Sequence, residues 1–499
     1  MKKLSLVLAF TIAACVSWAQ QTLWVSMGQI KYAFESQQVG LMPFSAGGDT
    51  LTIQGKAFAI ADIDSLYITS EIVDGNTVNI EYDNDKATAI IAGNIASQLT
   101  PTIDGAHVSM VQDTLMMQEV FYTLSGTSAD GSFFQSGNYK ATFILNGLTL
   151  TNTKGAAIVI DDGKRIEIQV ADGTTNTLED CEKGTQSACF VVEGHSEFKG
   201  GGNLVITGNT KHGFKSDEYM ELKKSFVGTI NVKKAVGDGV SVNQFLEVKS
   251  GNIIVDQCGN DGIQVDCKKD STKTNNGQFI MTGGYIRVNA TEDSGKGIKV
   301  EKDITISDGT IETTADDNAL HSKTNLTITG GNIYAYSVAA HGVNAGEITH
   351  IAGGNVVAYA PSTVGYSIRG AMALYISGGN IAGVGALVST PLECDTITVQ
   401  PVLTYTGTVA KTNFSLSDAD GNHVMAFTQG RSYSSSKKHT LFFSTPTFIE
   451  GATYTLYSGS TLDTEKENWH GLYLQPEAVT DSGTSLATGT AQAPFVRMQ

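Results

Sequence analysis

The sequence has little proline, little cysteine and few charged residues for its length. Its 499 residues include 8 Pro, 6 Cys and 17 % charged side chains, against 54 Gly and 41 % hydrophobic residues. The scarcity of proline excludes a collagen-like chain, and the low charge with ample apolar residues excludes an intrinsically disordered one. The chain is long enough and apolar enough to bury a sizeable core.

Basic residues are also scarce, with 33 Lys and Arg against 50 Asp and Glu, which gives a formal net charge of −17. Such a chain repels the phosphates of nucleic acids and of anionic membranes. We therefore expect no nucleic-acid partner.

The spacing of the few cysteines does not indicate a framework of disulfide bonds. Five remain beyond Cys15, an odd number at scattered positions, and no CxxC motif or Cys/His cluster indicates zinc. Cys181 and Cys189 are close enough in sequence to pair across a loop in an oxidising compartment. The alternative is that the cysteines are buried small residues.

Long hydrophobic runs are confined to the start of the chain. Two lysines, an apolar stretch and the small-residue sequence SWA give residues 1–19 the three parts of a secretory signal peptide. Residues 12–15 (IAAC) also resemble a lipobox, which would make Cys15 a lipid anchor, and both fates stay open. No other run reaches the roughly 18 apolar residues of a membrane span. We expect an exported protein that is secreted, periplasmic or at the cell surface, with no transmembrane span.

An internal repeat is the most informative feature of the chain. A residue pair that ends in glycine recurs along the chain. The final glycines of successive pairs are 26, 23, 33, 25, 22, 23 and 25 residues apart. The pairs are Gly201-Gly202, Val227-Gly228, Ser250-Gly251, Gly283-Gly284, Asp308-Gly309, Gly330-Gly331, Gly353-Gly354 and Gly378-Gly379. Two residues after each pair stands an apolar residue, and the alternation that follows is typical of strands. These residues are Leu204, Ile230, Ile253, Ile286, Ile311, Ile333, Val356 and Ile381.

Short strands at this period predict an all-β chain that forms a right-handed parallel β-helix of about 23 residues per coil. A β-propeller blade would need roughly 40 residues, and a β-sandwich would not repeat so regularly. We predict the signal peptide at 1–19, an N-terminal β segment or cap at 20–75, the β-helix at 76–400 and a C-terminal β domain or cap at 401–499. Caps are expected because an open last coil exposes a sheet edge.

Two rows of polar side chains are predicted to line one corner of the solenoid. Carboxylates stacked about 4.8 Å apart in one column can share a calcium ion, which prefers six to eight oxygen ligands. We predict calcium ligands among Asp217, Asp238, Asn243, Asp261, Asp266, Asp293, Asp316 and Asp317. The alternative for each is a hydrogen bond to a turn backbone.

Cationic and aromatic side chains interleave with this row. Lys215, Lys299, His321 and Arg369 follow the apolar residue that opens one strand of each coil, and they are candidates for binding the carboxylates of an acidic sugar. Plain cross-coil salt bridges are the alternative. Tyr334 and Tyr336 are candidates for stacking on sugar rings, although strand propensity alone also explains tyrosines.

Other catalytic signatures are missing from the sequence. It contains no G-x-S-x-G, Walker, H-E-x-x-H or Rossmann motif. A paired-carboxylate glycosidase stays open, because the distance between two carboxylates is not readable from sequence.

Residues of about 75–400 resemble a bacterial family of secreted carbohydrate-binding β-helix proteins, similar in fold to pectate lyases. The resemblance rests on residues 122–131 (YTLSGTSADG), 145–148 (LNGL), 171–180 (ADGTTNTLED), 212–217 (HGFKSD) and 261–266 (DGIQVD). The resemblance implies polysaccharide binding, and the family is associated with calcium and with acidic plant polysaccharides. By analogy with lyases of this architecture, Lys215 or Lys299 could abstract a proton beside calcium. The later coils depart from the acidic turn, at Asn318, His341 and Ser367.

Three functions follow from these observations. The first is an exported, calcium-assisted protein that binds polysaccharide, acidic or polyuronate-like in character, through the acidic corner. The second is a calcium-dependent polysaccharide lyase. The third is a non-catalytic surface adhesin or scaffold in which the repeat only supplies length.

Overall fold

The computed structural model describes residues 21–268, 272, 274–408, 412–434 and 436–499. The predicted leader and Cys15 lie outside the described residues, so both fates of the N-terminus stay predictions. Within the described ranges, no helix is long and apolar enough to cross a membrane.

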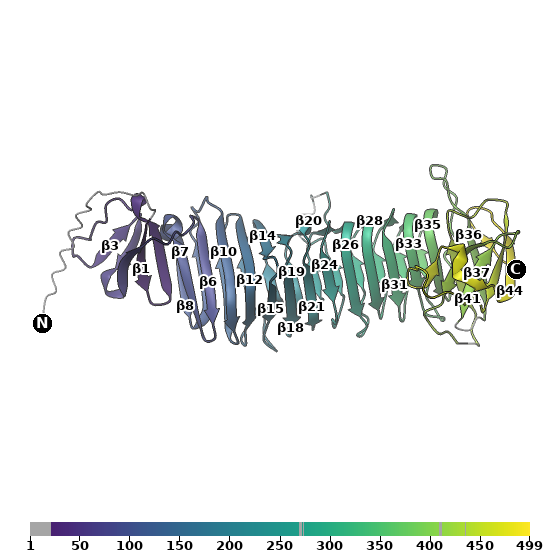
Figure 1. The fold of residues 1–499 in the computed structure, drawn as a ribbon, viewed down its shortest axis with the longest axis horizontal. Helices are drawn as coiled ribbons and strands as arrows, with labels where there is room; N and C mark the ends of the chain where they lie inside the picture. The colour runs from purple at the N-terminus through teal and green to yellow at the C-terminus, as the bar shows by residue number, and fades with distance from the viewer. Residues whose placement is uncertain (1–20, 269–271, 273, 409–411, 435) are drawn as a thin grey trace.

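Stacked coils form a long rod between residues of about 77 and 385 (Figure 1). There are about 11 coils, spaced by about 25 residues. Strands of successive coils pair in parallel and in register, so the predicted parallel β-helix is confirmed. The average spacing exceeds the predicted 23 because some coils carry insertions, such as the polar segment after Cys267.

Three stacks of strands form the walls of the rod, and we call them face 1, face 2 and face 3. Face 1 consists of β9 (Ala106–Gln112), β11 (Gly131–Ser136), β13 (Ile158–Asp161), β16 (Ala188–Val192), β19 (His212–Ser216), β22 (Val240–Val242), β25 (Ile263–Val265), β27 (Ile298–Val300), β29 (Leu320–Ser322), β32 (Val343–Ala345) and β34 (Ile368–Gly370). The antiparallel strand β8 (Leu99–Asp104) borders β9.

Faces 2 and 3 share one continuous sheet. Face 2 contains β6 (Thr77–Asp83), β14 (Arg165–Val170), β17 (His195–Gly200), β20 (Met220–Phe226), β23 (Phe245–Val248) and β30 (Leu326–Ile328). Face 3 contains β15 (Thr175–Glu179), β18 (Asn203–Gly208), β21 (Thr229–Ala235), β24 (Asn252–Val255) and β31 (Asn332–Ser337). Longer strands run from face 2 into face 3: β10 (Val120–Ser128), β12 (Ala141–Thr151), β26 (Gln278–Ala290), β28 (Ile304–Ala315), β33 (Ile348–Tyr359) and β35 (Ala373–Gly385).

The predicted glycine pairs make the corner between faces 2 and 3. Gly331 and Gly354 adopt φ of 84° and 82°, in the left-handed region that favours glycine. A Cβ on Gly331 would lie 2.6 Å from the carbonyl oxygen of Gly309 in the preceding coil. Glycine is therefore required there both by the bend and by the close approach of the next backbone.

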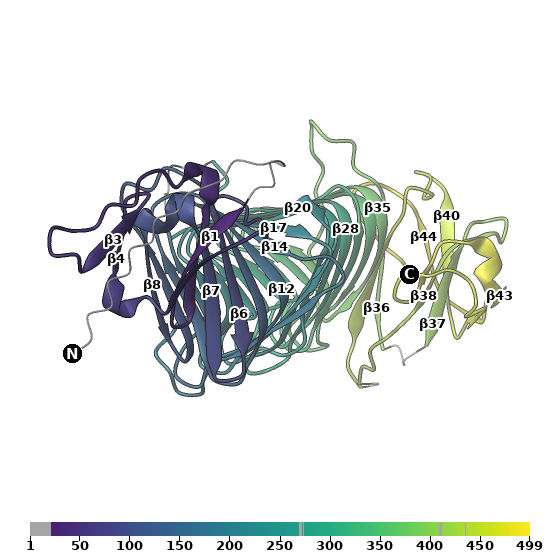
Figure 2. The same cartoon turned by 60° about the vertical axis from the view of Figure 1, so that its left-hand side comes forward.

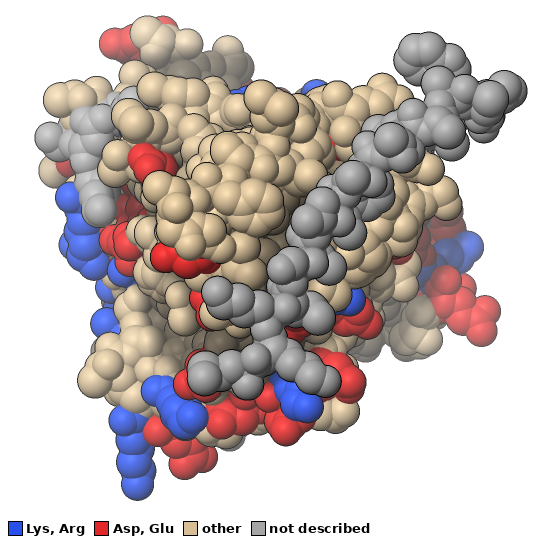
Figure 3. All heavy atoms as spheres, turned by 90° about the vertical axis from the view of Figure 1, so that its left-hand side faces the viewer, with Lys and Arg blue, Asp and Glu red and all other residues tan. Residues whose placement is uncertain are grey.

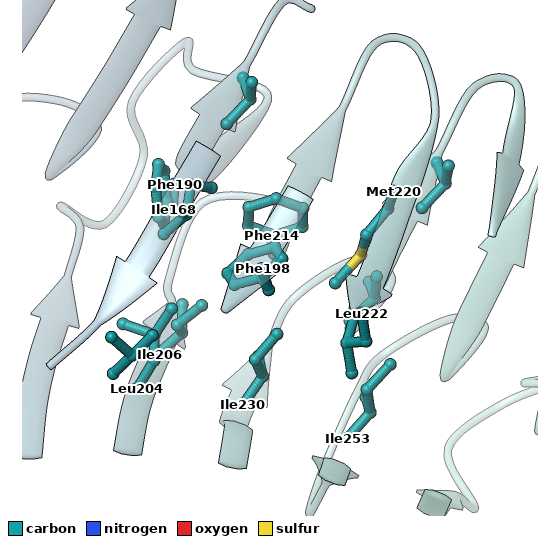
Figure 4. Packing of buried hydrophobic residues seen from close by; sticks show 14 of the residues in the cluster. Ile168, Phe190, Phe198, Leu204, Ile206, Phe214, Met220, Leu222, Ile230 and Ile253 are labelled. Carbon is teal, nitrogen blue, oxygen red and sulfur yellow. The ribbon is translucent and has the colours of Figure 1, made fainter. Parts of the chain in front are cut away.

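Apolar side chains fill the rod, one ladder per inner column. On face 1 the apolar residues that precede the polar row pair in register from coil to coil, and all are buried: Phe214, Val240, Ile263, Ile298, Leu320, Val343 and Ile368. Figure 4 shows Phe198 and Phe214 meeting between the walls, with ring centroids 5.4 Å apart. Burying each such side chain stabilises the fold by roughly 1.5–3 kcal/mol. Cys181 and Cys189 are both buried and both free thiols.

Antiparallel strands cover the N-terminal end of the rod. β1 (Thr22–Met27) pairs with β2 (Ile30–Glu35) and β5 (Ser65–Thr69), and β2 joins the first coil through β7 (Lys86–Ala92). The hairpin of β3 (Thr50–Ile53) and β4 (Lys56–Ala59) packs beside them. Figure 3 looks onto this end, where charged side chains gather toward the lower rim and uncharged residues fill much of the rest.

A β domain closes the C-terminal end (Figure 2). Its strand β39 (His439–Ser444) pairs antiparallel with β35 of the last coil and with β36 (Val402–Gly407), so the last sheet edge is covered. β45 (Val496–Arg497) pairs with β36. A five-stranded sheet packs beyond them: β42 (Leu472–Tyr473), β38 (His423–Thr428), β37 (Asn413–Ser417), β40 (Thr453–Ser458) and β44 (Thr484–Thr490).

Candidate functional site

A ladder of polar side chains runs along the outer side of face 1. Successive strands pair these residues in register: Lys215, Ser241, Gln264, Lys299, His321, Asn344 and Arg369. Because parallel strands lie about 4.8 Å apart, the ladder offers one polar side chain per coil. The structure thus places Lys215, Lys299, His321 and Arg369 in one line, as the repeat predicts.

Hydrogen bonds connect the later members of the ladder. Arg369 Nη1 donates to Asn344 Oδ1 at 2.8 Å, and Asn344 Nδ2 lies 2.9 Å from His321 Nδ1. Burial, followed by the charge of Lys296, lowers the pKa of His321 to about 4. His321 is therefore neutral at neutral pH and acts as a hydrogen-bonding group rather than as a cation.

Asp238 and Asp261 lie side by side at the edge of the ladder, and both side chains are almost fully buried. Asp238 Oδ1 accepts hydrogen bonds from Asn260 Nδ2 at 2.6 Å and from the Asp261 amide at 3.2 Å. The carboxylate of Asp261 accepts from the Lys296 amide and from Lys299 Nζ, both at 3.0 Å. Both aspartates are thus held by protein donors at a tight turn.

The buried carboxyl of Asp238 has an unusual proton affinity. Burial, followed by the charge of Asp261, raises its pKa to about 6. His212 Nδ1 accepts the Asp238 amide hydrogen at 3.0 Å and lies 3.2 Å from Asp238 Oδ2. Two acceptors at that distance repel each other unless Oδ2 carries a proton, which agrees with the raised pKa.

Lys299 is held as a cation. Burial alone would lower its pKa, but the charges of Asp261, Asp238 and Asp266 outweigh burial and raise it. Its ammonium lies 3.0 Å from Asp261 Oδ2 and 3.5 Å from Gln264 Oε1. An ammonium with a raised pKa is a poor proton-abstracting base, so Lys299 is suited to binding anions.

The pair Asp238–Asp261 does not fit a shared calcium ion. Three of its four carboxylate oxygens accept hydrogen bonds from protein groups, the fourth faces His212, and the Lys299 ammonium already occupies one side of Asp261. Calcium prefers six to eight oxygen ligands. Over the whole described part of the chain, no group of three or more His, Cys, Asp and Glu side chains is placed to hold a metal. Calcium binding stays a prediction.

The remaining predicted calcium ligands also have protein partners or face solvent. Asn243 Nδ2 donates to Asp217 at 3.0 Å, and Gln264 Nε2 donates to Asp266 at 2.8 Å. Lys215 and Lys268 pair with the same two carboxylates. In the second predicted group, Asp317 pairs with Lys296 at 2.5 Å, Asp316 accepts the Ser294 amide at 3.0 Å, and Asp293 is exposed.

Tyr334 and Tyr336 contact the C-terminal domain and are partly buried, and their stacking on sugar rings stays a prediction. The His470 ring stacks on Tyr334 with centroids 3.9 Å apart. The Arg431 guanidinium lies 5.1 Å from the centre of the Tyr336 ring. Both tyrosines stand on face 3 and pack, partly buried, against the core that joins the domain to the rod.

Sequence reasoning missed a charged stripe on face 2. Glu167, Glu197, Glu221 and Glu247 pair in register on adjacent strands. Arg165, Lys199, Lys223 and Lys249 compensate them. A glutamate flanked by apolar or small residues in each of these short strands was the available signal.

A polar hollow of about 490 Å³ near the N-terminal end of face 1 was missed as well. His107, Asp130 and Lys154 are among its lining residues. His107 Nδ1 lies 2.9 Å from Ser132 Oγ, but its Nε2 is 3.6 Å from Asp130 Oδ1. The second distance is too long for a hydrogen bond, so these residues do not form a serine–histidine–aspartate relay.

Known proteins resemble parts of this chain. A protein from Acetivibrio thermocellus, described as a carbohydrate-binding domain-containing protein, is 29 % identical over 173 residues, which cover 33 % of this chain. The matched part amounts to 52 % of that relative, so the chain spans about half of its length. A solved polysaccharide lyase-like protein from C. thermocellum, a gadolinium derivative, is 22 % identical with a TM-score of 0.38, covering 62 % of this chain and 100 % of that one.

The family of carbohydrate-binding domain-containing proteins matches residues 104–359, just over half of the sequence. This range contains the polar ladder from Lys215 to Asn344 and the aspartate pair beside it. The chain belongs to the carbohydrate-binding domain-containing protein family.

Proposed function

We propose that this chain is an exported protein that binds acidic, polyuronate-like polysaccharides along face 1. The observation that carries the proposal is the ladder from Lys215 to Arg369, in which a cation recurs at every third coil. Lys215, Lys299 and Arg369 are thereby spaced by about 14 Å, three times the strand spacing. The coils between these cations carry uncharged polar side chains at the same position: Ser241, Gln264, His321 and Asn344.

This arrangement suits an extended sugar chain that lies along the rod. One pyranose unit is close in length to one coil spacing, so each coil can offer a hydrogen-bonding side chain to one sugar. Carboxylates of the polymer would meet the three cations, and hydroxyl groups would meet Ser241, Gln264 or Asn344. A repeating ligand then matches a repeating protein surface.

Arg369 is the strongest single contributor in this proposal. Its guanidinium contacts the amide oxygen of Asn344 and lies 5.9 Å from the centre of the Tyr366 ring. Lys215 and Lys299, in contrast, already pair with Asp217 and Asp261. A guanidinium bound to neutral groups keeps donors for a bidentate contact with a sugar carboxylate.

Binding is favoured over lyase chemistry at Lys299. A lyase base must give up its own proton near the working pH, whereas Asp261, Asp238 and Asp266 raise the pKa of Lys299. The ion pair at 3.0 Å also holds its ammonium against Asp261.

Affinity electrophoresis of the mature chain tests the proposal. Gels would contain polygalacturonate, a neutral glucan or no polymer, each with and without a calcium chelator. Retardation by polygalacturonate alone supports the acidic ligand, and its loss with the chelator supports the predicted calcium. Equal mobility in all gels would contradict polysaccharide binding and favour a scaffold.

The residues are tested in the same gels. Lys299→Gln should weaken retardation by polygalacturonate, because it removes one of three cations. Lys234→Gln is the matched control, because Lys234 is an exposed lysine of face 3. Equal losses in both variants would show a general charge effect and would overturn the assignment to face 1.

A further inference from the structure

Strand β5 forms an open sheet edge at the N-terminal end of the rod. Within the described residues, β5 pairs with β1 along one side and with no strand along the other. Such an edge presents backbone N–H and C=O groups that can pair with another chain, and proteins usually protect it with charged residues or proline. Ser65–Thr69 (SLYIT) contains neither. This edge is therefore able to accept one more strand.

The apolar side chains of β5 are only half covered at this edge. Leu66 pairs with Val25, and Ile68 pairs with Leu23 on the same side of the sheet. These two partners in β1 are 0 % and 6 % exposed, whereas Leu66 and Ile68 remain 37 % and 44 % exposed. With Val39, they line a hollow of about 630 Å³. The sheet thus ends one strand short of covering its apolar side.

Further apolar side chains are exposed around the same edge. Leu41 follows Gly40, which lines the hollow, and Ile72 stands three residues after β5, and both Leu41 and Ile72 are exposed. Tyr67, on the opposite side of β5, stacks on Trp24 with ring centroids 6.1 Å apart and remains 38 % exposed. Large exposed apolar patches mark association sites. The patch around β5 therefore indicates a partner.

The sequence of β5 suits pairing with itself. Polar residues stand at both ends, apolar residues at the second and fourth positions, and Tyr67 at the centre. When two β5 strands pair antiparallel about Tyr67, Leu66 of one copy lies opposite Ile68 of the other, and Ser65 lies opposite Thr69. Both apolar pairs then lie on the side of the hollow and cover each other. A two-fold interface needs such self-complementarity, because the same patch must fit itself.

We propose that two copies of this chain associate head to head through β5. One antiparallel sheet then runs from β2, β1 and β5 of one copy into β5, β1 and β2 of the other. The N-terminal cap and the C-terminal domain lie at opposite ends of the rod, so the added strand extends the stack away from the coils (Figure 1). The ladder from Lys215 to Arg369 begins several coils away, so the association does not depend on the proposed polysaccharide binding.

Acidic residues that flank β5 set the salt dependence of this association. Asp64 and Glu71 lie just outside the two ends of the strand, and both are exposed. In the antiparallel register, Asp64 of one copy comes near Glu71 of the other, and these like charges repel. Salt screens the repulsion between exposed charges. Association should therefore strengthen as the salt concentration rises.

Sedimentation velocity of the mature chain over a range of protein concentrations tests the proposal. We expect the sedimentation coefficient to rise from that of a monomer to that of a dimer, and to do so at lower protein concentration in high than in low sodium chloride. A monomer at every protein and salt concentration would overturn the proposal.

Matched lysine variants locate the interface. A two-fold interface carries each substitution twice, so Ile68→Lys places two like charges between the copies and should weaken association by about tenfold or more. Met372→Lys is the control, because Met372 is an exposed apolar side chain at the C-terminal end of the rod. Equal weakening by both variants, or by neither, would overturn the assignment to β5.

Cross-linking gives a second readout that does not depend on an added charge. Tyr67→Cys places two thiols beside the two-fold axis, in a background in which the partly exposed Cys267 and Cys394 are replaced by serine. A short bis-maleimide should join two Tyr67→Cys chains into a covalent dimer and leave Met372→Cys monomeric. Equal yields of covalent dimer from both variants would contradict head-to-head pairing.

Discussion

Asp238 shows at the residue scale how one buried group can carry a proton near neutral pH. Its carboxyl sits between Asp261 and the ring of His212, which offers only a lone pair toward it. Burial, followed by the charge of Asp261, favours the protonated form and raises the pKa from 3.8 to about 6. A raised pKa in the folded state gives stability that is complete below about pH 4 and is lost as pH rises through about 6.

The variant Asp238→Asn should isolate this effect. It retains an acceptor for Asn260 and the Asp261 amide and cannot ionise. Relative to this variant, the free energy of unfolding of the wild type should fall by up to about 3 kcal/mol between pH 4 and pH 7. Urea midpoints across this range measure the difference. Two parallel pH curves would refute the raised pKa.

The asparagines that follow the corner glycines form a ladder of side-chain hydrogen bonds from coil to coil. Asn355 Nδ2 donates to Asn332 Oδ1 at 2.8 Å, and Asn380 Nδ2 donates to Asn355 Oδ1 at 3.0 Å. Thr445 of the C-terminal domain completes the series with a bond of 2.8 Å to Asn380. The sequence carries the signal as Gly-Asn followed by an apolar residue in five coils.

Asn355→Ala should therefore destabilise the rod beyond the loss of one contact. It leaves Asn332 Oδ1 and Asn380 Nδ2 each without this partner, at an expected cost of about 2–3 kcal/mol. Chemical unfolding measures the change, with Asn138→Ala as a control, since Asn138 is exposed and makes one bond to Thr114. Similar small losses in both variants would show that the ladder is not cooperative.

At the scale of elements, in-register parallel strands turn every repeated residue into a column. The column of four glutamates on face 2 would repel itself without its cations. Lys223 Nζ lies 3.0 Å from Glu167 and 2.6 Å from Glu197, whose side chain is only 7 % exposed. The lysine thus holds together strands of three successive coils.

Lys223→Met keeps most of the apolar stem and removes the charge. We expect a loss of about 2 kcal/mol in the free energy of unfolding, because Glu197 then keeps only the longer ion pair with Arg165 at 3.7 Å and Glu167 keeps only Lys199. Adding Glu197→Gln should recover more than half of the loss. A single variant as stable as the wild type, measured by urea unfolding at neutral pH, would show that solvent screens this stripe.

The inward-facing columns of the rod can be predicted from the sequence much better than the outward-facing ones. The glycine pairs and the apolar residues after them give the period, the corner and the inner columns, because each coil must repeat the same bend and the same burial. The outward-facing columns are harder to predict, because any outward position tolerates a polar residue. The positions of Lys215, Lys299, His321 and Arg369 are predictable because each follows a regular apolar residue. Glu167 and Glu197, in contrast, precede the first of the repeating glycine pairs.

Across the whole molecule, the C-terminal domain changes what the repeat exposes. Trp469 Nε1 donates to the Ile333 carbonyl at 3.1 Å, and His470 lies 3.0 Å from Glu312, so a segment more than 130 residues away covers face 3. No local pattern in β31 reveals this cover. Tyr334 and Tyr336 looked like exposed strand residues for that reason, and only the tertiary arrangement assigns them to an internal interface.

The variant Tyr334→Ala distinguishes a role of this tyrosine in packing against the C-terminal domain from a role in binding sugar. The substitution should cost about 3 kcal/mol of stability, because it opens a cavity between the rod and the domain. Retardation by polygalacturonate should remain as in the wild type once the fraction of folded protein is matched. Weakened binding by folded Tyr334→Ala would instead support stacking of this tyrosine on a sugar ring.

The most direct test of the central claim is the dissociation constant for polygalacturonate oligomers, measured by calorimetric titration of the wild type and of Arg369→Gln. Loss of a charge-assisted contact should weaken binding by about tenfold or more, while Lys234→Gln should bind as the wild type does. Unchanged affinity of folded Arg369→Gln would contradict binding along face 1.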